Sequence, residues 1–349
     1  MIDRRTFGKA LGAGATASVF GLSLPTVASA AVGGSSAGKP ASATAPSAGS
    51  ASFPPLKQVR AGELNIGYAQ LGPADGRPVI LLHGYPYDLH SYVDVAPLLA
   101  AEGYLVIVPY LRGYGTTSFL SPGTFRNGQQ SVFALDIIAL MDALHIQKAL
   151  LGGFDWGART ADIIAALWPD RCKALVSVTG YQIINREKNK LPVAPALERH
   201  LWFQYYFATE RGVLGLQENR HDLTELIWRD VSPTWNFDEA TFDRTAAAFM
   251  NPDFVSIVIS NYRWRLGLAQ GDPRYDKIEQ RLAAAPDIAV PTITLDPASD
   301  PTTPPGDGAS YRSKFTGPYA HRTLQGIGHN LPQEAPEAFA RAVLDVDRY

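Results

Sequence analysis

Residues 153–157 read Gly153-Phe154-Asp155-Trp156-Gly157, and this stretch decides the fold. It continues the apolar run Ala149–Gly153, which has the length and composition of a buried strand, and it precedes a helical pattern over residues 160–167. Small residues on both sides of a strand-to-helix turn permit a tight bend that lifts the central side chain above the sheet. We therefore expect Asp155 to project from the edge of a sheet as a reactive group.

Strand-like apolar runs alternate with helical patterns on both sides of this turn. Such alternation predicts an α/β fold with a mostly parallel central sheet and flanking helices. The expected strands are residues 78–83, 104–109, 149–153, 174–179, 292–296 and 320–324, and the expected helices are 93–101, 131–144, 160–167 and 336–345.

Residues 181–281 interrupt the alternation, because they contain few strand-like runs and four of the six tryptophans. We expect this segment to form an inserted helical cap over the sheet, with most of its aromatic side chains used for packing. The catalytic core would then comprise residues 53–180 and 282–349.

Composition narrows the function classes. The chain of 349 residues carries 31 basic and 33 acidic side chains, which argues against a nucleic-acid partner and leaves a small molecule as the expected one. A single cysteine excludes an intramolecular disulfide. The histidines outside the motifs described below show no metal-ligand spacing, so we expect no metal and no cofactor. Nothing in the composition indicates the oligomeric state.

The N-terminal residues have the three-part plan of an export signal. Arg4-Arg5-Thr6-Phe7-Gly8-Lys9 resembles the bacterial twin-arginine signal, a weakly apolar run follows it, and Ala28-Ser29-Ala30 is a cleavage-site pattern. We expect a signal peptide over residues 1–30 that is cleaved near Ala30, and a flexible linker over residues 31–52. The expected partner is the twin-arginine translocase and the expected location is the periplasm.

Two further groups follow Asp155 along the chain. Asp300 comes just beyond an expected strand, and His329 follows Gly328 after the last one. The order nucleophile, acid, histidine is typical of hydrolases built on such a sheet. Asp296 competes for the role of the acid, but it lies at the strand end rather than in the loop beyond.

An aspartate in the nucleophile position points to a particular chemistry. A carboxylate is ionised at neutral pH, since its usual pKa is about 3.9, and it needs no base in order to attack. It suits displacement at a saturated carbon, which leaves an alkyl ester of Asp155 for a later hydrolysis step. An acyl ester substrate is disfavoured, because the product would be a mixed anhydride.

From about Pro55 onward the chain resembles the capped α/β-hydrolases that use an aspartate nucleophile, namely epoxide hydrolases, haloalkane dehalogenases and fluoroacetate dehalogenases. The resemblance implies that Asp155 attacks carbon, that His329 oriented by Asp300 activates water, and that the Tyr85 and Trp156 backbone N–H groups form the oxyanion hole. The motifs that carry it are His83-Gly84-Tyr85-Pro86, Leu111-Arg112-Gly113-Tyr114-Gly115, Gly153-Phe154-Asp155-Trp156-Gly157 and Gly328-His329-Asn330-Leu331-Pro332-Gln333-Glu334.

The resemblance leaves the leaving group open. Tyr262 is similar to the second cap tyrosine of epoxide hydrolases, whereas Phe203 stands where the first is expected. Tyr205 or Tyr206 replaces that first tyrosine if the helix is shifted, and Gln204 accompanies it as a candidate substrate contact.

Other residues favour a halide. Trp156 resembles the halide-holding tryptophan of haloalkane dehalogenases, and Arg159 resembles one of two arginines that grip the substrate carboxylate in fluoroacetate dehalogenases. We expect epoxide hydrolysis, with dehalogenation of a haloalkane or haloacid as the alternative. A ligand-binding protein on the same fold is the alternative without catalysis.

Overall fold

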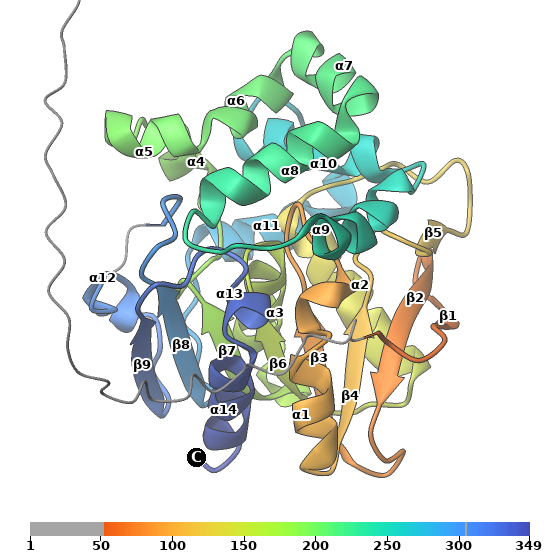
Figure 1. The fold of residues 1–349 in the computed structure, drawn as a ribbon, viewed down its shortest axis with the longest axis vertical. Coiled ribbons are helices and arrows are strands. Elements are labelled where there is room, and N and C mark those ends of the chain that lie inside the picture. The colour runs from red at the N-terminus through yellow and green to blue at the C-terminus, as the bar shows by residue number, and fades with distance from the viewer. Residues whose placement is uncertain (1–51, 304–305) are drawn as a thin grey trace, which may run out of the picture. The chain divides into compact units, whose positions relative to one another are not determined.

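The computed structural model describes residues 52–303 and 306–349. The predicted signal peptide and the linker up to residue 51 lie outside these residues. The described chain builds a nine-stranded sheet in the order β1-β2-β4-β3-β6-β7-β8-β9, with β5 paired to β2 (Figure 1). From β4 to β9 all neighbouring strands run parallel, and β1, β2 and β5 form an antiparallel margin.

The strands are short and mostly buried on both faces, which is typical of a parallel sheet covered by helices. In chain order they are β1 (Lys57–Ala61), β2 (Leu64–Leu71), β3 (Arg77–Leu82), β4 (Tyr104–Pro109), β5 (Ser118–Phe119), β6 (Ala149–Gly153), β7 (Cys172–Val178), β8 (Thr292–Pro297) and β9 (Tyr319–Leu324).

Helices cover both faces of the sheet. The helices α1 (Val95–Ala101) and α14 (Pro336–Val346) pack together on one face, and α2 (Gln130–Ala143) and α3 (Trp156–Leu167) pack together on the other (Figure 1). Short helices α12 (Ala309–Arg312) and α13 (Leu331–Glu334) lie in the connections near the C-terminus. The predicted α/β fold with a mostly parallel sheet and flanking helices is confirmed.

The antiparallel margin was not predicted from the sequence. The strands β1 and β5 are half exposed, so they lack the continuous apolar runs by which the parallel strands were recognised. The helix α3 also begins at Trp156, four residues earlier than expected, because the turn at Asp155 leads directly into it.

Between β7 and β8 the chain forms helices and no named strand. They stack at one end of the sheet, and α6, α7, α8 and α10 pack against one another (Figure 1). The expected cap range 181–281 contains them all except the last two residues of α11. These helices are α4 (Arg186–Asn189), α5 (Pro195–His200), α6 (Trp202–Ala208), α7 (Glu210–Glu218), α8 (Arg220–Val231), α9 (Glu239–Ala246), α10 (Phe254–Arg265) and α11 (Asp276–Ala283).

The turn between β6 and α3 is strained and tightly packed. Asp155 has φ +50° and ψ −121°, a backbone conformation that residues other than glycine rarely adopt. A Cβ atom on Gly157 would lie 1.9 Å from the carbonyl oxygen of Leu82 in β3, and one on Gly153 would lie 2.4 Å from the Gly157 carbonyl carbon. Glycine at both positions therefore lets the turn fit against the neighbouring strand.

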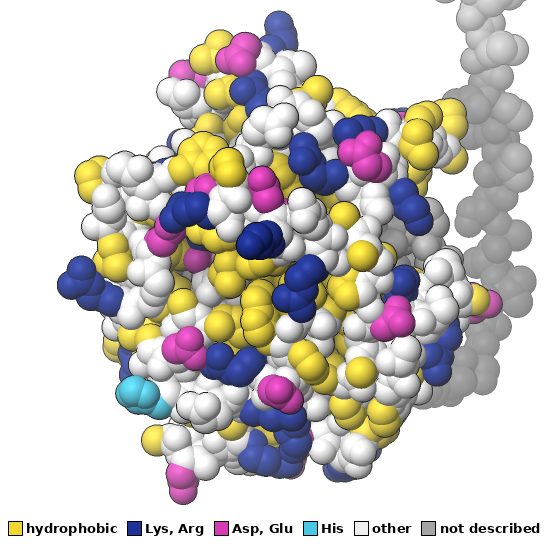
Figure 2. Space-filling model, turned by 180° about the vertical axis from the view of Figure 1, so that it is seen from behind, with side chains coloured by type: hydrophobic (Ala, Val, Ile, Leu, Met, Phe, Trp, Pro, Cys, Tyr) yellow, Lys and Arg dark blue, Asp and Glu magenta, His cyan; other side chains and the backbone are white. Residues whose placement is uncertain are grey.

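Charged side chains of both signs are interspersed with hydrophobic ones on the face seen in Figure 2. This mixed pattern is the ordinary surface of a globular domain. None of the helices in the part of the chain that the structure describes combines the length and the apolar character needed to span a bilayer.

We expect Gly157→Ala to destabilise the protein, because the new methyl group cannot avoid the Leu82 carbonyl without moving β3 or α3. Overpacking of this kind lowers the free energy of unfolding by about 1–3 kcal/mol, which urea denaturation would measure. The control is Gly123→Ala, whose Cβ would have only the Ser121 hydroxyl nearby, at 3.8 Å. Equal stability of the two variants would contradict the close approach at the turn.

Candidate active site

Asp155, Asp300 and His329 meet at one edge of the sheet. They follow β6, β8 and β9, and the carboxyl ends of parallel strands all lie at the same edge. The His329 Nδ1 atom is 2.6 Å from Asp300 Oδ2, and its Nε2 atom is 3.8 Å from Asp155 Oδ2. The imidazole thus lies between the two carboxylates, with one ring nitrogen held and the other facing Asp155.

Asp300 is held in place by the loop that carries it. Its other carboxylate oxygen accepts hydrogen bonds from the Thr302 N–H at 2.8 Å and the Thr302 hydroxyl at 2.6 Å. Asp296 is occupied elsewhere, since it accepts a hydrogen bond from the Tyr311 hydroxyl at 2.8 Å and lies 3.8 Å from His321. Of the two candidate acids, Asp300 is therefore the one beside His329.

The two oxygens of Asp155 have different surroundings. Oδ1 accepts a hydrogen bond from the Tyr85 backbone N–H at 2.8 Å, while Oδ2 faces His329. The Trp156 N–H is the first of α3 and has no acceptor within the helix. The N–H groups of Tyr85 and Trp156, which are expected to form an oxyanion hole, both lie at the Asp155 turn, and Oδ2 is the carboxylate oxygen on the His329 side.

His83 fixes the loop that carries Tyr85. It is fully buried, and its Nε2 atom accepts a hydrogen bond from the Leu111 N–H at 3.1 Å. A nitrogen that accepts is unprotonated, so the ring is neutral and Nδ1 donates to the Gly84 carbonyl oxygen at 3.0 Å. Burial lowers the pKa of His83 to about 4, which is consistent with this neutral state. His83 is a positioning residue.

Charges within the site shift the pKa values of Asp155 and His329 apart. Burial alone would raise the pKa of Asp155, but His329, Arg159 and the Tyr85 N–H together lower it to about 2. Burial alone would lower the pKa of His329, but Asp300 and Asp155 raise it to about 10. At neutral pH the resting site therefore holds an ionised Asp155 next to a protonated His329.

Three aromatic side chains that can donate hydrogen bonds, Tyr85, Trp156 and Tyr262, lie close to Asp155. Tyr262 on α10 lies against Trp156 and Tyr85, with ring centroids 5.9 and 5.5 Å apart. Burial raises the pKa of the Tyr262 phenol, and the Asp155 charge raises it further, so the hydroxyl stays protonated. The Tyr85 hydroxyl and the Trp156 indole N–H are buried without a hydrogen-bond partner among the described residues.

The helix α6 contributes two of its expected residues. Phe203 and Gln204 line the small cavity above Asp155, whose volume is about 60 Å³. Tyr205 lies outside this cavity and lines the larger one beside it; its side chain is 42% exposed and its hydroxyl donates to Glu198. Tyr206 points to α7, where its hydroxyl packs against Gly215. Neither tyrosine takes the place of Phe203.

Arg159 lines the same cavity from α3, one turn after Asp155. The residue is only 3% exposed, and its Nε atom donates to the Gln182 carbonyl oxygen at 3.1 Å. The expected site residues Asp155, Tyr85, Tyr262 and His329 also line this cavity.

Sequence reasoning missed several residues of the site. Arg265, Gln182 and Thr302 also line the cavity. Glu334 accepts hydrogen bonds from the Gly328 N–H at 2.7 Å and the Asn330 N–H at 3.1 Å, which fixes the loop on both sides of His329. A signal existed for Arg265, since it follows Tyr262 by three positions on one helix face.

Comparisons with known proteins agree with this architecture. The sequence profile of the family described as alpha/beta hydrolase fold matches residues 77–336. A crystal structure of a candidate epoxide hydrolase from Klebsiella pneumoniae is 59% identical, with a TM-score of 0.83 over 84% of this chain and 97% of that chain. A candidate epoxide hydrolase from Pseudomonas aeruginosa, 21% identical with a TM-score of 0.69 over 83% of this chain and 94% of that chain, shares the fold.

Among curated proteins, epoxide hydrolase B of Mycobacterium tuberculosis is 33% identical over 152 residues. That match covers 40% of this chain and 42% of the relative, so the aligned part spans less than half of each protein. The family match over most of the described residues is decisive for the fold. The chain belongs to the alpha/beta hydrolase fold family.

Proposed function

We propose that the chain is an epoxide hydrolase that works through a covalent ester of Asp155. One observation carries this proposal: the ionised carboxylate of Asp155 and the protonated phenol of Tyr262 line the same small cavity. Opening an epoxide needs a nucleophile at carbon and a proton donor at oxygen. Asp155 Oδ2 and the Tyr262 hydroxyl are placed to supply them.

In the first step Asp155 Oδ2 attacks an epoxide carbon and the carbon–oxygen bond breaks. The resulting alkoxide takes the proton of Tyr262, which is the stronger acid of the two. Oδ1 becomes the carbonyl oxygen of the ester and keeps its hydrogen bond from the Tyr85 N–H. The negative charge of Asp155 disappears in this step, which removes one of the two charges that raise the pKa of His329.

The loss of that charge turns His329 from an acid into a base. Its proton replaces the one that Tyr262 gave up, and the neutral imidazole then deprotonates a water. The hydroxide attacks the ester carbonyl carbon, and the Tyr85 and Trp156 N–H groups stabilise the oxyanion. Release of the diol restores ionised Asp155 and protonated His329, so the cycle consumes one epoxide and one water.

The names of two similar proteins support this reaction. The Klebsiella pneumoniae neighbour and the Mycobacterium tuberculosis relative are described as a candidate epoxide hydrolase and an epoxide hydrolase. Dehalogenation uses the same nucleophile and base, and the unpartnered indole N–H of Trp156 is a donor that suits a halide. The two reactions differ in the ester they leave on Asp155, which makes them separable by mass.

We also propose that the chain is exported to the periplasm through the twin-arginine translocase. The proposal is supported by the sequence alone: Arg4-Arg5, the weakly apolar run and Ala28-Ser29-Ala30 occur in the order of such a signal. This route transports folded proteins, which suits an enzyme whose site is assembled from distant parts of the chain.

We expect His329→Gln to accumulate the Asp155 ester, because attack does not need the imidazole whereas hydrolysis does. Intact mass spectrometry after incubation with pooled epoxides, haloalkanes and haloacids would measure it. An epoxide adds its whole mass, and a halide adds its mass minus that of the hydrogen halide. The control Asp155→Asn/His329→Gln should show no adduct. A folded His329→Gln protein without adduct would contradict the mechanism and favour a binding protein.

The second prediction concerns the proton on His329. We expect nuclear magnetic resonance titration to give a His329 pKa of about 10 in the wild type and a lower value in Asp155→Asn, because the substitution removes a negative charge beside the ring. The matched control is Asp296→Asn, which removes a carboxylate bonded to Tyr311 and should leave the His329 pKa unchanged. Equal values in wild type and Asp155→Asn would contradict the charge coupling.

Export is tested by replacing Arg4 and Arg5 with lysine. We expect this double substitution to keep the unprocessed chain in the cytoplasm of a bacterium that has a twin-arginine system, as measured by cell fractionation and N-terminal mass. Lys39→Gln, beyond the predicted cleavage site, serves as the control and should not change export. Equal periplasmic yield from the arginine and lysine forms would refute the proposal.

A further inference from the structure

The catalytic cavity opens into a second, larger one of about 480 Å³. Five residues line both cavities and form the neck between them: Arg159, Gln182, Leu201, Gln204 and Arg265. A substrate whose epoxide lies against Asp155 would place the rest of its chain in this neck. The chemistry of the neck therefore determines what that chain can carry.

Two guanidinium groups meet at the neck. Arg159 comes from α3, one turn after the nucleophile, and Arg265 is the last residue of α10, one turn after Tyr262. Neither forms an ion pair with an acidic side chain in the part of the chain that the structure describes. The bonds found for them are that of Arg159 Nε to the Gln182 carbonyl oxygen and a 3.4 Å contact of Arg265 Nε with Asn189.

Such an arrangement is unfavourable without an anion. Burial and the like charge of Arg265 together lower the pKa of Arg159 to about 10, although Asp155 and Asp162 act in the opposite direction. Buried cations in proteins are normally paired, because taking a charge out of water is costly. The neck keeps two cations close together with no carboxylate between them, which marks it as a site for an anionic group.

The chemistry of the two side chains indicates a carboxylate as the anion. Asp155 and the buried Asp162 already compensate part of the charge of Arg159, so a dianionic phosphate would overcompensate. A carboxylate carries a single charge and matches the planar fork of a guanidinium. The Gln204 amide also lines the neck, as a further hydrogen-bond donor.

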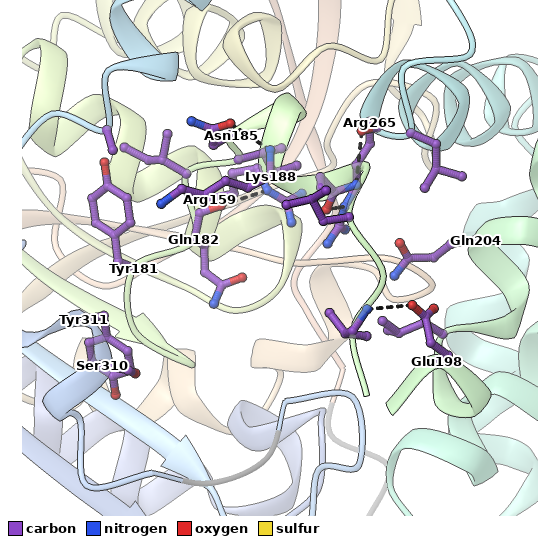
Figure 3. A pocket seen from close by; sticks show the side chains of 18 of the residues that line it. Arg159, Tyr181, Gln182, Asn185, Lys188, Glu198, Gln204, Arg265, Ser310 and Tyr311 are labelled. Atoms are coloured by element: carbon purple, nitrogen blue, oxygen red, sulfur yellow. Dashed lines mark hydrogen bonds between the residues drawn. The ribbon is translucent and has the colours of Figure 1, made fainter. Parts of the chain in front are cut away.

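The outer cavity continues the same charge pattern. Lys188 lines it together with the two arginines (Figure 3). Glu198 is the acidic side chain in its lining, and it is occupied by the Tyr205 hydroxyl and by the Val193 N–H at 2.8 Å. A hollow whose charged lining residues are mainly cations attracts anions and repels cations.

We infer that the neck between Arg159 and Arg265 is a carboxylate site, and that the substrate is an epoxide whose carbon chain carries a carboxylate. This inference rests on the proposed function, because it concerns the part of the epoxide substrate that Asp155 does not attack. In this inference Arg265, at the end of α10, is the residue that distinguishes epoxides with a carboxylate from those without one.

The test compares molecules that differ only in charge. We expect kcat/KM for epoxyhexanoate to exceed that for epoxyhexanamide by about tenfold or more in the wild type, the equivalent of one charge-assisted hydrogen bond. The ratio should fall towards one in Arg265→Gln and be largely retained in Arg265→Lys. Shorter acids, glycidate and epoxybutanoate, report the separation between the epoxide and the carboxylate.

The matched control is Arg263→Gln. Arg263 lies two residues earlier on the same helix, but its charge is paired with Glu210 at 2.8 Å and it lines neither cavity. We expect this variant to keep the wild-type ratio. An equal loss of the ratio in Arg263→Gln and Arg265→Gln would refute a specific site at the neck.

A binding measurement separates this inference from the proposed reaction. Calorimetry with unreactive hexanoate and hexanamide should show tighter binding of hexanoate to the wild type and loss of that difference in Arg265→Gln. If both epoxides are turned over equally and hexanoate has no advantage, the carboxylate site is refuted while epoxide hydrolysis stands. If hexanoate binds through Arg265 but neither epoxide reacts, the carboxylate site stands and the proposed function is refuted.

Discussion

The strained turn at Asp155 is the constraint on which the site depends. A positive φ at a residue other than glycine persists only when its surroundings hold it, and here they do so from both sides. Gly157 fits against the Leu82 carbonyl on one side, and the Tyr85 N–H binds the carboxylate on the other. Because Leu82 and Tyr85 both belong to the region at the end of β3, the same segment shapes the turn and supplies the backbone N–H that binds the Asp155 carboxylate. A shift of this segment would disturb the position and the charge of Asp155 together.

The second constraint is electrostatic. Two carboxylates are buried at this site, and each would be unfavourable there without a cation, so His329 between them stabilises both. In the proposed reaction the same coupling determines the order of events, since the imidazole acts as a base only after Asp155 has lost its charge. In that reaction Asp300 keeps the ring aligned while Asp155 changes state. Thr302 at Asp300 and Glu334 on the loop of His329 supply that fixed frame.

Much of this could be predicted from the sequence, for physical reasons that also explain what could not. Parallel strands buried on both faces form continuous apolar runs, so β3, β4, β6, β7 and β8 are recognisable in the sequence. The strand β9 is only half-buried and carries a weaker signal. The half-exposed strands β1 and β5 leave no such run. The residues proposed to react could be predicted because they lie at strand ends within short motifs. Sequence could not separate Tyr205 from Phe203, because the position of a side chain around a helix decides which cavity it lines, and Phe203 lines the inner one and Tyr205 the outer one. Gln182 contacts Arg159 through its backbone carbonyl oxygen. Every residue type has such a carbonyl, so the sequence does not reveal this contact.

The site consists of two cavities with different proposed tasks. The inner one holds the reacting group of the substrate, and the neck and the outer one recognise the rest of the substrate. In the proposed reaction the groups around the inner cavity form and hydrolyse the ester, and its volume of about 60 Å³ leaves little room for anything but the reacting group. On this proposal, whatever distinguishes one epoxide from another is recognised in the neck or beyond it. The neck lies between α3 and α10. Arg159 is on the helix that begins directly after Asp155, and Arg265 is on the helix that carries Tyr262. An anion bound between them would hold the helical segment and the sheet at a fixed separation, and it would align Asp155 and Tyr262 on opposite sides of the epoxide. Substrate recognition at this position thus contributes to catalysis as well as to affinity, because it orders the two groups that must act in the same step.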